Sequence, residues 1–153
     1  MRTLGNIIWH FPFFGFVSAI CTYILGAILT ATVVASPIGL GLMEFGKFQF
    51  TPFGHAMVSK SKLAGEAPNK LWSTYSTIVR IIYFPFGLIL TIIGVFQVVG
   101  LFISIIGIPI ALVLAKSLRT YFNPINKVCV HSAVTDELER RKAQEQIDKH
   151  LNK

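Results

Sequence analysis

The sequence is poor in charged residues, and two long stretches contain none at all. Charged residues make up 14% of the chain, against roughly 25% in an ordinary soluble domain. No Lys, Arg, Asp or Glu occurs in residues 3–43 or in residues 81–115. Because a soluble fold needs polar side chains to cover its surface, this composition excludes a soluble globular protein.

Both uncharged stretches are long enough to enter a membrane. Each exceeds the roughly 20 residues that a helix needs to cross a hydrocarbon core of about 30 Å. A cleaved signal peptide is the wrong interpretation for the first stretch, because the apolar region of such a peptide is only about 7–15 residues long. We therefore predict a mainly α-helical, multi-pass membrane protein.

The chain also lacks the residue groupings of an active site. No His, Asp and Glu recur at helical spacing within the apolar stretches, so we predict no enzyme activity, no catalytic residue and no cofactor. Cys129 and His131, with His55, offer three scattered ligands for zinc. They lack the paired spacing of a zinc site, so no metal site is predicted.

Positive charge is concentrated beside the apolar stretches. Residues 1–131 hold nine basic residues against Glu44 and Glu66, whereas residues 132–153 hold five basic and five acidic ones. Basic residues next to membrane segments favour the cytoplasmic side and attract anionic headgroups. The predicted partner is a lipid bilayer with anionic headgroups, and no nucleic-acid binding is expected.

The two halves of the chain resemble one another. Ser36–Glu44 aligns with Ile108–Lys116, and the same offset places Pro52 on Pro124 without gaps. Each half therefore contains a pair of prolines at the same spacing. A constant offset, here of about 72 residues, is the signature of an internal repeat. The pattern predicts a duplicated membrane domain over residues 1–131, with repeat one at 1–72 and repeat two at 73–131. A polar helical tail follows at 132–153.

Each repeat has the same expected structure. A transmembrane or re-entrant segment, broken by Pro and Gly, precedes an amphipathic helix, a Pro turn and a short strand. In the second repeat we expect a break at residues 85–87. The strands at residues 55–59 and 127–131 are expected to pair with each other, because neither is stable alone. Two topologies remain open: each repeat is a tight hairpin, or each crosses the membrane once and the halves are inverted.

Glu44 and Lys116 occupy equivalent positions in the two repeats. Each is the first charge after its apolar stretch and lies seven residues beyond a proline. We predict that these opposite charges face one another where the repeats meet. At the Pro turns, Gly54 and its counterpart Asn126 are both suited to a left-handed backbone.

These motifs together resemble the YccF domain family of bacterial inner membrane proteins. The resemblance rests on Ser104–Pro109, on Lys116 and on the turn Pro52–Gly54, and it spans most of residues 1–131. It implies a location in the inner membrane and no settled activity, with transport suggested. The chain departs from the family at Asn126, where a Gly is expected. The structural or functional candidates are Pro37, Glu44, Pro52, Phe53, Gly54, Gly107, Pro109, Lys116, Pro124 and Asn126.

Two functions fit these observations. The first is an oligomeric pore or transport component, because duplicated and interrupted membrane segments recur in transporters. A homo-oligomer is expected in that case. The alternative is a membrane scaffold or accessory subunit that binds a partner through its cytoplasmic face.

Overall fold

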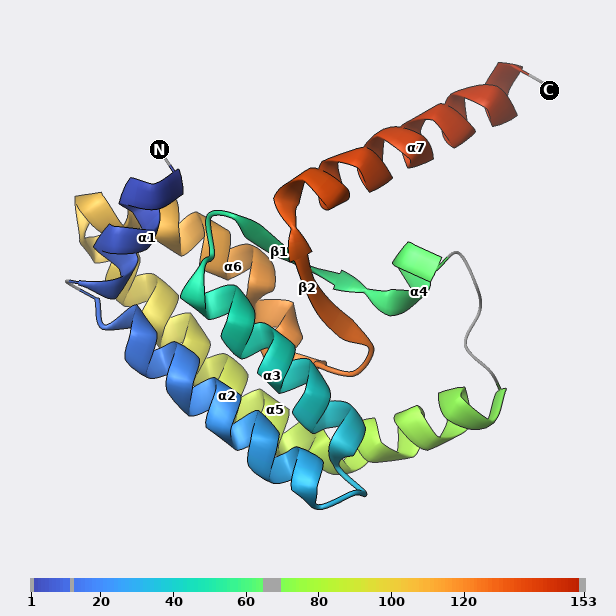
Figure 1. Ribbon diagram of the computed structural model, residues 1–153, viewed down its shortest axis with the longest axis horizontal. Helices are drawn as coiled ribbons and strands as arrows, with labels where there is room; N and C mark the ends of the chain where they lie inside the picture. Colours follow the sequence, from blue (N-terminus) through green and yellow to red (C-terminus); the bar gives the residue numbers. More distant parts are fainter. Residues whose placement is uncertain (1, 12, 65–69, 152–153) are drawn as a thin grey trace.

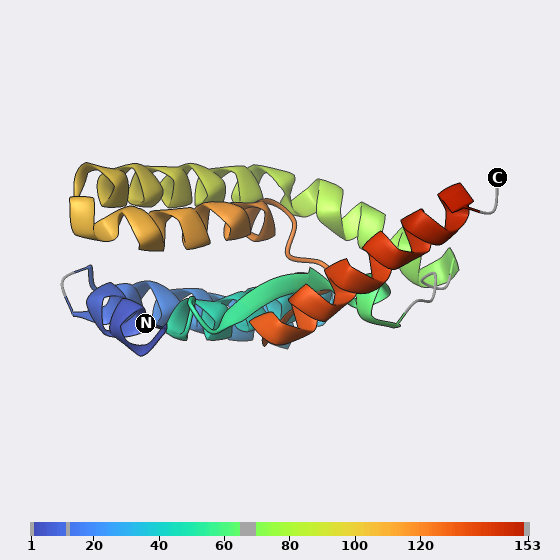
Figure 2. The same cartoon turned by 90° about the horizontal axis from the view of Figure 1, so that it is seen from above.

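The computed structural model is mostly helical and describes residues 2–11, 13–64 and 70–151. Two helical hairpins follow one another along the chain, and a two-stranded ribbon joins them (Figure 1). Seen from above, the first hairpin and the second form separate layers (Figure 2). The prediction of a mainly α-helical fold is confirmed.

The first hairpin consists of three helices. Helix α1 (Arg2–His10) is followed by α2 (Gly15–Ala31), and the two are bent by 82° at the break between them. Helix α3 (Ser36–Phe50) then runs back along α2 (Figure 1). Pro37 lies in the first turn of α3, where its missing N–H costs no helical hydrogen bond.

The second hairpin begins with a longer helix. Helix α5 (Lys70–Ile103) passes into the 3₁₀ turn η1 (Ile105–Gly107), and α6 (Ile108–Phe122) returns along it. The predicted break at residues 85–87 is wrong, because α5 runs through Pro85 without interruption. Proline removes a single backbone donor, whereas ending the helix in an apolar layer would leave several groups unpaired.

The predicted strand pair is present. Strand β1 (His55–Ser59) pairs antiparallel with β2 (Lys127–His131), in a register centred on Met57 opposite Cys129. Backbone bonds extend the ribbon at both ends, from Lys60 N to Asn126 O (2.8 Å) and from Ser132 N to Gly54 O (3.0 Å). The ribbon thus ties the two hairpins together.

Two helices leave the ribbon. The short helix α4 (Lys60–Ala64) follows β1, and α7 (Ser132–Leu151) follows β2. None of the residues of α7 is buried, and the helix projects away from the hairpins (Figure 1). Of the predicted polar tail at 132–153, residues 132–151 are helical.

The packed core lies between the hairpins, and the outer faces of α2 and α5 are apolar. Large side chains of α1, α3 and α6 form much of the core, among them Trp9, Phe45 and Ile110. Exposed Ile and Phe side chains cover α2 and α5 instead. Within the described ranges, Lys70–Ile103 and Ile105–Phe122 are long and apolar enough to cross a membrane. The bent pair Thr3–His10 and Gly15–Ala31 would make a third span.

Candidate functional site

A polar cluster centred on Gln49 lies at the contact between the two hairpins. Gln49 is fully buried, near the end of α3. Its Nε2 donates hydrogen bonds to Ser18 Oγ at 3.1 Å and to the hydroxyl of Tyr121 at 2.7 Å. The amide therefore joins α3 to α2 and to α6, across both hairpins.

Two further bonds hold the backbone around this cluster. Trp9 Nε1 donates to the carbonyl of Gln49 (2.8 Å), and the Tyr83 hydroxyl donates to the carbonyl of Tyr121 (3.1 Å). Both carbonyls lie in the last turns of their helices, where no intrahelical donor reaches them. The amide oxygen Oε1 of Gln49 is buried and has no hydrogen-bond partner among the described residues.

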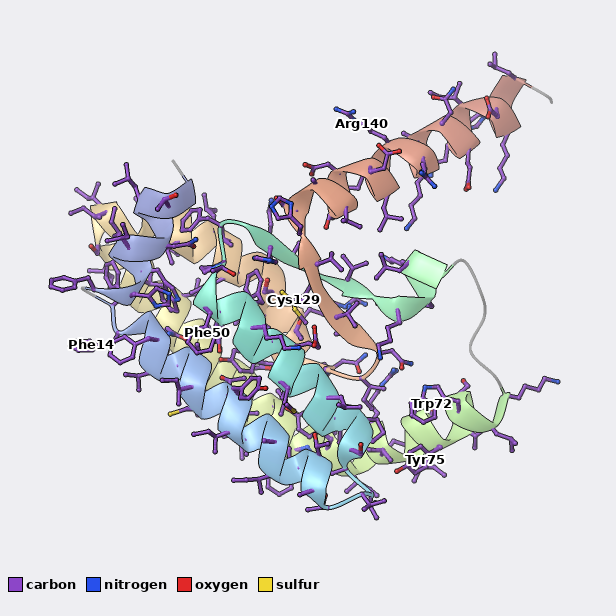
Figure 3. The ribbon with its side chains drawn as sticks, viewed as in Figure 1. Phe14, Phe50, Trp72, Tyr75, Cys129 and Arg140 are labelled. Atoms are coloured by element: carbon purple, nitrogen blue, oxygen red, sulfur yellow. The ribbon has the colours of Figure 1, made fainter. Side chains whose placement is uncertain are left out.

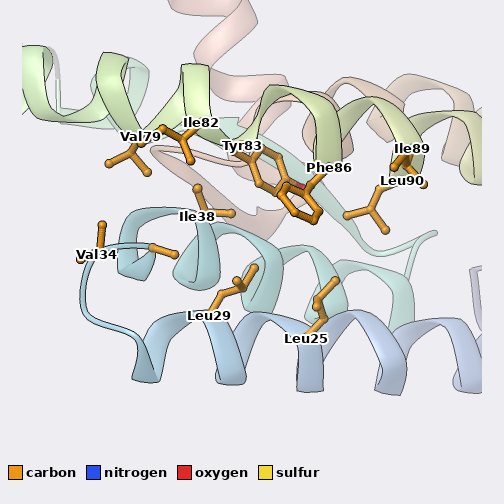
Figure 4. A pocket seen from close by; sticks show the side chains of 11 residues that line it. Leu25, Leu29, Val34, Ile38, Val79, Ile82, Tyr83, Phe86, Ile89 and Leu90 are labelled. Atoms are coloured by element: carbon orange, nitrogen blue, oxygen red, sulfur yellow. The ribbon is translucent and has the colours of Figure 1, made fainter.

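A cavity of about 250 Å³ opens beside the cluster. Hydroxyls and a thiol from α2 contribute to its wall, together with the ring of Tyr121. The complete lining is Ser18, Cys21, Thr22, Leu25, Leu90, Ile93 and Tyr121. Leu25 and Leu90 also line a neighbouring apolar cavity of about 320 Å³ between α2 and α5 (Figure 4). The two cavities therefore share part of their walls.

Sequence reasoning missed the central residue of this cluster. Ser18 and Thr22 belong to the first uncharged stretch, where hydroxyls are compatible with a polar path as well as with helix packing. Gln49 stands in the run Phe48-Gln49-Phe50, which has no recognisable motif. One signal was available: Gln49 and Tyr121 are 72 residues apart, so each is the polar residue at the same position of its half.

Glu44 has partners other than the one predicted. Its carboxylate forms an ion pair with Lys47, one turn further along α3, and accepts a hydrogen bond from the backbone N–H of Cys129 (3.0 Å). The expected pairing with Lys116 is wrong: no ion pair joins these residues in the part of the chain that the structure describes. Lys116 is exposed on α6, where water solvates an ammonium group better than a single carboxylate does.

The hydrogen bond from the Cys129 N–H makes Glu44 a link between α3 and the ribbon. A two-stranded ribbon leaves backbone N–H groups unpaired along its outer edge, and Glu44 satisfies one of them from α3. Burial raises the pKa of the Cys129 thiol to about 11, with a further contribution from the negative charge of Glu44. Figure 3 shows Cys129 on the ribbon beside α3.

The predicted prolines delimit the helices. Pro109 lies in the first turn of α6, as Pro37 does in α3. Pro52 and Pro124 follow the last residues of these helices and are fully buried. The residue before each, Thr51 or Asn123, has φ near −140°, away from the helical backbone that a following proline disfavours.

The remaining candidates shape turns rather than a site. Asn126 has the expected left-handed backbone (φ 59°), whereas the prediction for Gly54 is wrong, because its φ lies outside that region. Phe53 N donates to Asn6 Oδ1 (3.3 Å) and thereby anchors α1. Gly107 packs against the backbone of Leu101 at the tip of the second hairpin.

Two histidines lie side by side on the ribbon. His55 and His131 are cross-strand neighbours with their ring centroids 5.7 Å apart. His55 Nδ1 lies 2.8 Å from Thr51 Oγ1. Over the described ranges no group of three His, Cys, Asp or Glu side chains is arranged to hold a metal ion.

The arrangement found in the first half has a counterpart among known families. Residues 4–55 match the YccF family, described as an inner membrane component domain. The YccF match covers α1 from Leu4 onward, α2, α3 and the first residue of β1, and it confirms the resemblance for that range. Beyond residue 55 the resemblance stays a prediction. No curated protein and no solved structure was found to match the chain.

The YccF description and the helices agree on location. An inner membrane component is what the family name indicates, and the apolar outer faces of α2 and α5 suit a lipid environment. The YccF match and the candidate membrane spans therefore support an inner membrane location. Ser18, Glu44 and Gln49 lie inside the YccF-matched segment, whereas Tyr121 lies beyond it.

Proposed function

We propose that the protein is an oligomeric transport component or pore subunit of the inner membrane, whose polar site is the Gln49 cluster. The observation that carries the proposal is a buried amide and several hydroxyls beside a cavity, between helices whose outer faces are apolar. Polar groups at membrane depth are costly unless they are paired or used, and they often mark a substrate path.

The chemistry of the site suits a small polar solute or a partly dehydrated ion. Hydroxyl groups of Ser18, Thr22 and Tyr121 both donate and accept hydrogen bonds, and the Gln49 Oε1 atom is an acceptor without a partner among the described residues. No charged side chain of the described chain lines the cavity. Selectivity among solutes would therefore come from the dipoles of these hydroxyl and amide groups, as in pores lined by carbonyl and hydroxyl oxygens.

We further infer that the membrane domain arose from two copies of one unit. Helices α3 (36–50) and α6 (108–122) start and end at equivalent positions of the two halves, as do β1 (55–59) and β2 (127–131). The offset is the one that separates Gln49 from Tyr121. The two bonds that close the ribbon, from Lys60 N and from Ser132 N, are related by the same offset. The second copy diverges where α5 is unbroken.

The ribbon also supports a common side for the charged segments. Because β1 and β2 are antiparallel neighbours, α4 and the α7 tail leave the same short ribbon. Helix α4 carries Lys60 and Lys62, and α7 carries basic and acidic side chains in near balance. Because Lys and Arg determine orientation and acidic residues contribute little, we place both helices on the cytoplasmic side of a multi-pass protein. Of the predicted connecting loop 59–70, residues 65–69 lie outside the described residues. Cysteines introduced at Ser61 and Ser132 should both resist an impermeant reagent in intact cells.

Flux through reconstituted protein tests the transport proposal. Purified protein in liposomes should pass small ions or polar solutes faster than empty liposomes do. Thr22→Val removes a cavity hydroxyl with little change in shape and should alter the flux or its selectivity. The matched control is Thr91→Val, because the Thr91 hydroxyl only bonds its own helix at Gly87 O (2.7 Å). Equal flux for both variants and for the unmodified protein would show that the cavity takes no part in transport.

One observation favours the alternative, a membrane scaffold. Helix α7 has no buried residue over Ser132–Leu151 and alternates acidic with basic side chains. Such a helix is suited to bind a partner of mixed charge. If liposomes show no flux while deletion of residues 136–153 abolishes a cellular phenotype, the scaffold interpretation replaces the first.

A further inference from the structure

Another cavity lies where the ribbon meets α4 and α7. Its volume is about 200 Å³, and about half of its lining is polar. Side chains from β1, β2, α4 and α7 contribute to it. They are Met57, Val58, Ser59, Lys62, Lys127, Thr135, Leu138, Glu139 and Lys142.

Positive charge dominates this cavity. Lys62, Lys127 and Lys142 line it, against a single carboxylate from Glu139. No ion pair joins Glu139 to any of these lysines among the residues that the structure describes. Burial lowers the pKa of Lys127, and the positive charges of Arg119 and Lys62 lower it further. Three lysine side chains whose positive charges repel one another therefore line the same cavity.

A hydroxyl group in the same cavity lacks a partner. The Oγ1 atom of Thr135 is buried and makes no hydrogen bond with any described residue. A threonine hydroxyl normally finds a partner when it is buried. Three ammonium groups and a free hydroxyl donor provide the groups that a phosphate oxygen requires.

The position of the cavity indicates where such a phosphate would come from. The rings of Trp72 and Tyr75 lie 5.9 Å apart and tilted by 47° near the start of α5 (Figure 3), and Trp72 Nε1 donates to Asn126 Oδ1 at 3.2 Å. Asn126 directly precedes Lys127. Paired Trp and Tyr side chains are typical of the headgroup level of a bilayer, so the lysines lie beside that level.

We propose that this cavity binds a phosphate group of net negative charge, through Lys62, Lys127, Lys142 and Thr135. Membrane phospholipid headgroups and soluble phosphate share this chemistry, and the headgroup level indicated by Trp72 favours the lipid. Binding would couple the ribbon and α7 to the composition of the bilayer, since all four ligands lie on ribbon, α4 or α7.

The full chain in an uncharged detergent allows the test, with bound lipid counted by native mass spectrometry. Short-chain phosphatidylglycerol carries a net negative charge, and short-chain phosphatidylcholine carries the same phosphate without net charge. We expect tighter binding of phosphatidylglycerol. Inorganic phosphate in excess should displace little of it if the natural ligand is a lipid and most of it if the ligand is soluble. Equal binding of the two lipids would overturn the proposal.

Charge variants assign the binding to this cavity. Lys127→Gln should raise the apparent Kd for phosphatidylglycerol by about fivefold, the equivalent of about 1 kcal/mol for one cation near a headgroup. Lys149→Gln makes the same charge change on the exposed end of α7, outside the cavity, and should change the Kd less than about twofold.

A variant that is expected to bind phosphatidylglycerol more tightly distinguishes an effect on the cavity from unfolding of the protein. Glu139→Gln removes the carboxylate that lines the cavity and should tighten binding by about two- to fivefold. Misfolding cannot produce that result. If Lys127→Gln and Glu139→Gln both bind phosphatidylglycerol as Lys149→Gln does, the cavity is not the binding site.

Discussion

The two hairpins have matching element bounds but pack in different ways. In the first, Gly26 of α2 faces Gly39 of α3 so closely that a Cβ at Gly39 would overlap Thr30 and the Gly26 carbonyl. The equivalent positions of the second hairpin are Val98 and Ala111. In the second hairpin, a Cβ at Gly94 would meet the side chains of Leu118 and Tyr121. Helices that meet at backbone distance gain dispersion contacts where water is absent.

The entry to each hairpin differs as well. In the first half the buried Trp9 ring covers Gly15, where any Cβ would enter the indole. Helix α1 therefore folds back as a separate element. At the equivalent Gly87 the neighbours are Tyr83 and the carbonyl of Phe122, and α5 continues straight through. A close-packed, bent half and a looser, continuous half thus share one ribbon.

The largest effect is expected at the tight helix crossing. Gly39→Ala should lower the free energy of unfolding by about 2–3 kcal/mol, because the new methyl group meets backbone atoms that cannot move independently. Gly100→Ala in α5 is the control, since no described atom lies within 4 Å of its Cβ. It should stabilise by about 0.5–1 kcal/mol. Thermal unfolding in detergent measures both, and equal shifts would contradict the packing difference.

The next effect concerns the link between α3 and β2. Glu44→Ala leaves the Cys129 N–H without its acceptor and should cost about 1–3 kcal/mol of stability. Lys116→Ala, at the equivalent position of the second half, should cost less than about 0.5 kcal/mol. The double variant should equal the sum of the two within about 0.5 kcal/mol. A larger coupling would mean that Glu44 and Lys116 interact after all.

A smaller effect is expected for the hydrogen bond that joins the hairpins in the core. Tyr121→Phe removes the acceptor of Gln49 Nε2 and should destabilise by about 1–1.5 kcal/mol. The control is Tyr75→Phe, because the Tyr75 hydroxyl also bonds the other hairpin, at Val34 O (2.8 Å), but in an exposed position. Loss of this exposed bond should cost less than about 0.5 kcal/mol, as is usual for a surface substitution. A reversed order would show that the Gln49 cluster does not hold the layers together.

The smallest effect is on the thiol of the ribbon. In a Cys21→Ser background, alkylation of Cys129 should reach half of its maximal rate near pH 11, following its pKa of about 11. Glu44→Gln keeps an acceptor for the Cys129 N–H but removes a negative charge. Ionisation of the thiol becomes easier, so the midpoint should move to lower pH. An unchanged midpoint would attribute the raised pKa to burial alone.

Local features of the fold could be predicted from the sequence. Proline fixes φ and lacks a donor, so α3 and α6 have Pro37 and Pro109 in their first turns and end before Pro52 and Pro124. The strands at residues 55–59 and 127–131 followed from the constant offset between the halves and the need of short strands for a partner. The left-handed Asn126 follows from its side chain.

Features that depend on distant contacts could not be predicted. Pro85 occurs inside a helix because, in an apolar layer, breaking the helix would cost more free energy than losing one hydrogen bond. The residues around Pro85 do not by themselves reveal that the helix lies in such a layer. Glu44 binds a backbone N–H from 85 residues away, a partner with no signature in side-chain charge. Gln49 became recognisable only once α2, α3 and α6 were placed around it.

The ribbon also imposes an order on biosynthesis. Ser59 of β1 pairs with Lys127 of β2, so the first strand leaves the ribosome well before its partner. At about 5–20 residues per second, this delay is on the order of 3–14 seconds. During that time the first half must insert with β1 unpaired and Glu44 without the Cys129 N–H. Chaperone engagement or strand exchange between two nascent chains would act in this interval, before the second hairpin closes the ribbon.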